Sequence, residues 1–157
     1  MSEKYCILYA AETEQCELPL SDGEVRRVEL TESLNFGDFL KGLESDEKLV
    51  LLSDDCGLNL FANKSSGFLE KREVFYYPAG KKKAFYRDIA QNPENPQIVE
   101  ISRYLHNLPS VRINGKLRKF VNGISFGLDA ELADSAGNSF WPAAKKILFG
   151  VPSWLLS

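Results

Sequence analysis

The residues best suited to chemistry are two consecutive carboxylates, Asp54 and Asp55, which directly follow an apolar run at 49–53. Such a run is typical of a buried parallel strand that leads through a short loop into a helix. Ligands of open α/β sheets bind outside the carboxyl ends of these strands, so the two side chains stand where a site is expected. The alternative is structural, because an Asp just before a helix caps its free amides. Position alone favours the cap.

Three consecutive lysines, Lys81, Lys82 and Lys83, form a second charged cluster. They follow a predicted strand at 73–77, in a turn that leads into another helix. A parallel sheet would place this turn beside the acidic pair, where lysines can hold an anion as point charges. A solvated basic turn is the commoner explanation of a charge run. For charge runs in general, we favour that explanation.

Other nucleophilic or metal-binding side chains are sparse. His106 is the only histidine, and the sequence places no matched nucleophile near it, which is poor support for acid–base catalysis. The cysteines Cys6, Cys16 and Cys56 are odd in number and lack CxxC spacing, so neither a disulfide framework nor a zinc site is indicated. A thiol at a helix N-terminus can be activated, but the sequence offers Cys56 no resolving cysteine.

Length and composition indicate an ordinary globular protein. The 157 residues suit one domain, or one domain with an appendage. A formal net charge of -3 argues against bulk attraction to nucleic acid or anionic lipid, although it does not exclude local charged patches. The N-terminus lacks the pattern of a signal peptide and no apolar stretch is long enough to span a bilayer, so we expect a cytoplasmic protein without a transmembrane segment.

Hydrophobic periodicity predicts strands and helices in alternation up to residue 109. The predicted strands lie at 5–10, 25–30, 48–53 and 73–77. The predicted helices lie at 36–43, from Leu58 onward and at 98–108. This order indicates an α/β fold with a parallel sheet and helices on both of its faces.

From Ser110 the pattern changes to antiparallel β structure. Asn114-Gly115, between apolar runs at 111–113 and 117–121, predicts a hairpin with a type I′ turn. A glycine-punctuated strand follows at 122–129, and capping signals predict a helix at 139–150. We therefore expect an α/β domain over 1–109 and an incomplete β-rich segment with a C-terminal helix over 110–157.

These motifs, in this order, resemble the diacylglycerol kinase family of lipid kinases, which are relatives of the sphingosine kinases and NAD kinases. The family motif Gly-Gly-Asp-Gly-Thr-Leu-Asn is similar to residues 53–59, with Asp55 and Asn59 at its aspartate and asparagine. The loop Pro-x-Gly-Thr-x-Asn-Asp-Phe is similar to residues 78–85. The strand Phe-x-Asn-x-x-x-x-Gly-x-Asp is similar to residues 120–129.

The resemblance implies a nucleotide-binding α/β domain and a β-rich domain that helps to form a lipid site. Family members bind ATP and Mg²⁺ between these domains and transfer phosphate to a lipid hydroxyl. On this basis Asp55 is the candidate catalytic residue, and Asp54 with Asp55 is the candidate magnesium pair. The candidate nucleotide contacts are Asp54, Asp55, Gly57, Asn59, Gly80, Lys81, Lys82, Lys83 and Asn122.

The chain departs from the family pattern in each phosphate-binding loop. Ser53, Asp54 and Cys56 stand where the family has glycines, and side chains there obstruct close approach of the backbone to phosphate. Lys83-Ala84 replaces an Asn-Asp pair, and the acidic segment 10–14 replaces an Asn-Pro-x-Ser-Gly loop. The chain is also about half as long as a family member, so we expect most of the β domain to be missing. Because phosphoryl transfer depends on positioning and charge neutralisation, we expect little or no kinase activity.

Other interpretations stay open at this point. The three lysines could replace the lost amides beside an Asp54–Asp55 magnesium pair, which would give an altered but active site. The opposed charges could instead form plain salt bridges between the two loops and bind nothing, which we favour. An interaction or regulatory module could use the old cleft, or bind a protein partner or a second copy through apolar C-terminal side chains. These side chains are Phe140, Trp141, Trp154 and Leu155. The chain could also be a truncated family member.

Overall fold

The computed structural model describes residues 3–20, 22–69 and 72–122. The chain divides into two compact units, Met1–Asn122 and Gly123–Ser157, and every described residue belongs to the first. The predicted helix at 139–150, most of the predicted strand at 122–129 and the apolar C-terminal side chains lie outside the described residues.

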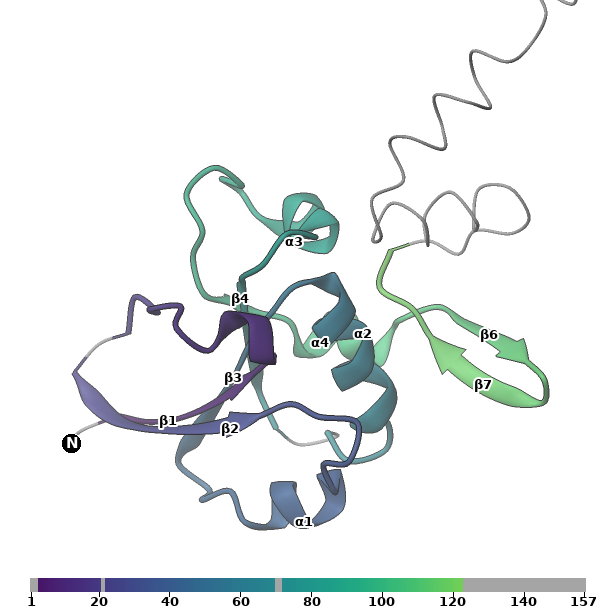
Figure 1. The fold of residues 1–157 in the computed structure, drawn as a ribbon, viewed down its shortest axis with the longest axis horizontal. Helices are drawn as coiled ribbons and strands as arrows, with labels where there is room; N and C mark the ends of the chain where they lie inside the picture. The colour runs from purple at the N-terminus through teal and green to yellow at the C-terminus, as the bar shows by residue number, and fades with distance from the viewer. Residues whose placement is uncertain (1–2, 21, 70–71, 123–157) are drawn as a thin grey trace, which may run out of the picture. The chain divides into compact units, whose positions relative to one another are not determined.

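The described unit is built on a five-stranded sheet in the order β2-β1-β3-β4-β5 (Figure 1). The strands are β1 (Glu3–Tyr9), β2 (Gly23–Glu29), β3 (Glu47–Ser53), β4 (Val74–Pro78) and β5 (Val99–Glu100). The first four are parallel and β5 is antiparallel to β4. Since β1 lies between β2 and β3, the strand order reverses there, and a switch point forms between β1 and β3.

Short helices follow the strands. They are the 3₁₀ helix η1 (Ala11–Thr13), α1 (Phe36–Lys41), α2 (Asp55–Lys64), α3 (Ala84–Ile89) and α4 (Ser102–His106). The helix expected at 98–108 forms only from Ser102, because Val99 and Glu100 pair with the open edge of β4. That edge offers unpaired backbone groups, and a β-branched residue such as Val99 favours an extended backbone.

In the described residues, the four α-helices pack on one face of the sheet. Leu8, Leu51 and Tyr76 are register neighbours on that face and belong to one core cluster with side chains from every α-helix. The other face carries Ile7 and Leu52 and is covered by Cys16, Leu18 and Leu20. The expectation of helices on both faces is therefore not met in this part of the chain. The described part of the β1–β2 connection contains Pro19 and forms only η1.

A hairpin of β6 (Ser110–Ile113) and β7 (Lys116–Lys119) forms a separate two-stranded sheet. Its turn residues Asn114 and Gly115 have φ angles of 49° and 78°, so the predicted turn with two positive φ angles is confirmed. In Figure 1 the hairpin is drawn to the right of α2. No helix among the described residues is long and apolar enough to cross a membrane.

Candidate functional site

The turns after β3 and β4 lie side by side at the carboxyl edge of the sheet. Ser53 and Pro78 are partners in the parallel register. The Ala79 amide donates to the Ser53 carbonyl at 3.0 Å, and the Asp55 amide donates to the Lys82 carbonyl at 2.8 Å. The predicted juxtaposition of the 53–57 and 80–84 turns is confirmed by these bonds.

Asp54 is the N-cap of α2. Its Oδ1 accepts hydrogen bonds from the amides of Cys56, at 2.9 Å, and Gly57, at 3.2 Å. Its carbonyl accepts the amide of Leu58 at 3.0 Å, which begins the helical bonding pattern. The structural interpretation of Asp54 is thus confirmed, and α2 begins at Asp55 rather than at Leu58.

Asp55 caps a different helix, α3, from the first turn of α2. Its Oδ2 accepts the amide of Ala84 at 2.8 Å, and its Oδ1 accepts the amide of Phe85 at 3.3 Å. Asn122 Nδ2 also donates to Oδ2, at 2.8 Å. Lys83, the N-cap residue of α3, makes no side-chain capping bond of its own. A carboxylate that is only 4% exposed therefore closes the start of α3 and ties together three segments of the chain.

Together the two carboxylates occupy four backbone amides, those of Cys56, Gly57, Ala84 and Phe85. Amides at helix N-termini are the groups with which α/β proteins hold phosphate. Here both helix starts are already satisfied by negative charge from within the chain. The N-termini of α2 and α3 at this sheet edge are therefore capped by carboxylates of the chain itself.

Close packing explains the two glycines of these turns. A Cβ on Gly57 would lie 2.6 Å from the Cβ of Ser53, which is closer than real side chains approach. A Cβ on Gly80 would lie 3.1 Å from the Cβ of Asp54, and Gly80 has a φ of +82°. The resemblance implied nucleotide contacts for both glycines, and the packing of the two turns accounts for them without a ligand.

The turn after β1 closes the switch point. The Ala10 amide donates to the Leu52 carbonyl at 3.1 Å. The Thr13 hydroxyl lies 2.7 Å from the Ala10 carbonyl and 2.9 Å from the Leu52 carbonyl, and Thr13 is buried. Backbone and side-chain bonds therefore fasten the β1 turn onto the end of β3. The sequence interpretation missed Thr13, whose only signal is a hydroxyl three residues after a strand end.

The expected salt bridges between the loops are absent in the described residues, where no ion pair joins Asp54 or Asp55 to a lysine. Lys81 and Lys82 are exposed, and Lys83 is half-buried. The loops are joined instead by the Lys82 carbonyl and by the amides that follow Lys83. The favoured interpretation of paired charges was therefore wrong, because the carboxylates bind backbone donors.

Polar side chains on one face of α2 hold the end of the hairpin. Asn63 accepts the Lys119 amide and donates to the Lys119 carbonyl, each at 2.9 Å. One turn earlier, Asn59 Oδ1 accepts the Val121 amide at 3.1 Å. Asp55 completes a spacing of four, which places the three side chains on one helix face. The segment 119–122 thus runs along α2, and residues 110–122 belong to the same unit as the sheet, past the predicted boundary at 109.

This ladder gives structural partners to two predicted nucleotide contacts, Asn59 and Asn122. It also includes Asn63, which the sequence interpretation missed. The available signal was Asn59-x-x-x-Asn63 within the predicted helix, with Asp55 another four residues earlier, since polar residues four apart in a helix form a stripe.

Tyr76 lies beneath the two turns and donates its hydroxyl to the Ser53 carbonyl at 3.1 Å. Burial, with a further contribution from the charges of Asp55 and Asp54, raises the pKa of Tyr76 far above its ordinary value. The phenol therefore stays protonated and acts as a fixed donor. His106 is exposed on α4, and no group of three or more His, Cys, Asp or Glu side chains in the described ranges is arranged to hold a metal.

No family model, no curated protein and no solved structure matches this chain. The structure shows a mixed α/β protein with a mostly parallel five-stranded sheet and a separate antiparallel hairpin. The diacylglycerol kinase resemblance stays a prediction.

Proposed function

We propose that this protein has a diacylglycerol-kinase-like fold whose phosphate-binding edge is closed by its own carboxylates, and that it works as a non-catalytic interaction module. The order of the turns after β1, β3 and β4 supports the fold, since they meet at one sheet edge. The observation that carries the loss of catalysis is the capping of four helix amides by Asp54 and Asp55.

Binding of a polyphosphate at this edge would first displace these bonds. Hydrogen bonds to a charged group contribute roughly 1.5–3 kcal/mol each, and a buried carboxylate left without donors adds a desolvation cost. Asp55 is buried, so it would bear that cost in full. Nucleotide binding at this edge is therefore opposed by the loss of these hydrogen bonds and by repulsion between the phosphates and the two carboxylates.

The same bonds oppose the implied magnesium pair. Mg²⁺ requires near-octahedral oxygen ligands and usually takes one or two carboxylates together with substrate phosphates. Asp55 uses both oxygens on three donors, and Asp54 uses Oδ1 on two. Under this proposal ATP and Mg²⁺ are not cofactors, and a lipid hydroxyl is not phosphorylated.

Calorimetry with magnesium-ATP at millimolar concentration tests the proposal, together with transfer of labelled γ-phosphate to diacylglycerol in mixed micelles. We expect no saturable heat and no labelled lipid. The competing active-site interpretation assigns phosphate binding to the exposed lysines. It predicts magnesium-dependent heat that disappears in Lys81→Ala with Lys82→Ala and persists in Arg87→Ala, an exposed cation on α3. That pattern would refute the proposal.

A further inference from the structure

The β6–β7 hairpin concentrates basic charge in a chain whose net charge is -3. Its cations are Arg112, Lys116, Arg118 and Lys119, and residues 110–122 contain no acidic side chain. None of the ion pairs among the described residues involves these cations. The first three are exposed, so their charge faces solvent without a carboxylate to neutralise it.

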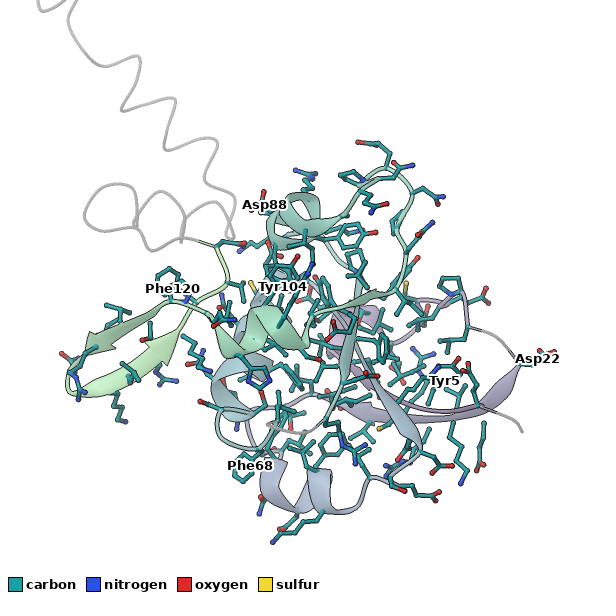
Figure 2. The ribbon with its side chains drawn as sticks, turned by 180° about the vertical axis from the view of Figure 1, so that it is seen from behind. Tyr5, Asp22, Phe68, Asp88, Tyr104 and Phe120 are labelled. Carbon is teal, nitrogen blue, oxygen red and sulfur yellow. The ribbon has the colours of Figure 1, made fainter. Side chains whose placement is uncertain are left out.

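The tip of the same hairpin exposes aliphatic side chains. Ile113 is 47% exposed and Leu117 is 60% exposed, and they are two of the four large exposed hydrophobic residues in the described ranges. Register pairs Ile113 with Lys116 and Leu117 with Arg112, and directly opposed residues share a face. Each face of the tip therefore presents one aliphatic side chain beside one cation. Figure 2 shows side chains standing out from both sides of this ribbon.

The hairpin is anchored at its base and free at its tip. Asn63 and Asn59 hold Lys119 and Val121, and the Phe120 amide donates to the Pro109 carbonyl at 3.1 Å. Phe120, labelled in Figure 2, follows β7 at this base and is half-buried. In the described residues no third strand pairs with β6 or β7. A two-stranded ribbon is marginal alone, so the clamp on α2 holds the tip in place.

We propose that the tip of the β6–β7 hairpin docks on an anionic lipid bilayer, with Ile113 and Leu117 entering the interfacial region and the neighbouring cations against the headgroups. Apolar insertion and basic charge are the two signals that together give stable attachment to a membrane surface. A nucleic acid is a poorer match, because its binders stack bases on aromatic side chains or read base edges with polar ones. The tip carries aliphatic groups instead. This inference stands on the hairpin alone and does not depend on the closed sheet edge.

The expected size of the effect follows from the charges. Each Lys or Arg near an anionic membrane surface strengthens binding about fivefold. Reversal of two charges should therefore weaken binding by at least about thirtyfold, and added salt should weaken it further.

The first experiment is co-sedimentation of the full chain with vesicles of phosphatidylcholine containing about one third phosphatidylserine, compared with pure phosphatidylcholine. We expect binding only to the anionic vesicles. It should be lost in Lys116→Glu with Arg118→Glu and in Ile113→Ser with Leu117→Ser. It should persist in Lys41→Glu with Arg87→Glu, which reverses two exposed cations elsewhere. Equal loss in that control, or no binding of the unmodified chain, would overturn the proposal.

A second measurement guards against variants that fail to fold. Two tryptophan variants are made in a Trp141→Phe, Trp154→Phe background, so that the introduced indole is the only one. In Leu117→Trp, this indole should shift its emission to the blue and be quenched by brominated lipid when anionic vesicles are added. In Phe68→Trp, at an exposed position outside the hairpin, it should do neither. Indole signals that respond alike at both positions would contradict docking by the tip. Tighter binding to an oligonucleotide that is unaffected by Ile113→Ser with Leu117→Ser would assign the surface to nucleic acid and overturn the lipid proposal.

Discussion

Replacement of Asp55 should destabilise the protein far more than replacement of any exposed carboxylate. Asp55→Ala removes the acceptor of three donors, the amides of Ala84 and Phe85 and the side chain of Asn122. Phe85 is buried, so its amide bears most of the cost of an unmade bond, roughly 1–3 kcal/mol. The other two donors belong to exposed residues and regain water, so each loses about 0.5–1 kcal/mol. The sum is about 3 kcal/mol.

Urea unfolding followed by circular dichroism measures this loss. Asp55→Asn keeps one acceptor but turns an NH₂ group toward the donors, so we expect a loss of about 2 kcal/mol. Asp88→Asn, at an exposed position on α3, is the matched control and should stay within about 0.5 kcal/mol. A double-mutant cycle with Asn122→Ala should give a coupling of about 1 kcal/mol. If Asp55→Ala costs no more than the Asp88 control, the carboxylate does not hold α3 and the description of the edge is wrong.

Three further predictions test the packing of the unit. Gly57→Ala should cost roughly 1–3 kcal/mol in urea unfolding, because the added methyl would lie 2.6 Å from the Cβ of Ser53 at the end of β3. The control Gly37→Ala, whose added methyl would make only an ordinary contact at 3.5 Å, should be neutral or stabilising. Asn63→Ala should cost about 1–2 kcal/mol, because both of its hydrogen bonds to the backbone of Lys119 are lost. Hydrogen exchange of the Lys119 amide should become faster. Burial raises the pKa of Cys6 from 9.0 to about 11, so the stability that its thiol contributes is full below pH 9 and is lost as the pH rises toward 11. Between pH 8 and pH 10 the unmodified chain should therefore lose more free energy of unfolding than Cys6→Ala. At pH 8 only the exposed Cys56 should react quickly with a thiol reagent.

Local patterns made much of the sheet predictable from the sequence. Each predicted strand up to 77 forms within a few residues of its expected bounds. Continuous apolar runs made β1, β3 and β4 recognisable as buried parallel strands, whereas β2 is an exposed strand of mixed polarity. The N-cap of α1 is Asn35, whose side chain accepts the amide of Asp38 three residues later, and Asn114-Gly115 forms its turn. These features depend on residues close together in the chain.

Features that depend on distant partners were not predictable in the same way. Nothing near Asp55 in sequence indicates that its acceptors serve α3, 29 and 30 residues later. The failure of the helix at 98–108 likewise depends on the open edge of β4, which is visible only once the strand order is known. Helix cover on one face in the described residues follows from a β1–β2 connection that is tied down by Thr13. In each case a tertiary bond overrides a local preference.

The central claim is that the amides at the starts of α2 and α3 are already occupied. Backbone NMR of the full chain, titrated with magnesium-ATP and separately with inorganic phosphate, tests it most directly at Cys56, Gly57, Ala84 and Phe85. The carboxylate caps predict that these four resonances stay in place up to millimolar ligand. Saturable, magnesium-dependent movement of the four together would show that phosphate displaces the carboxylates, and would contradict the account.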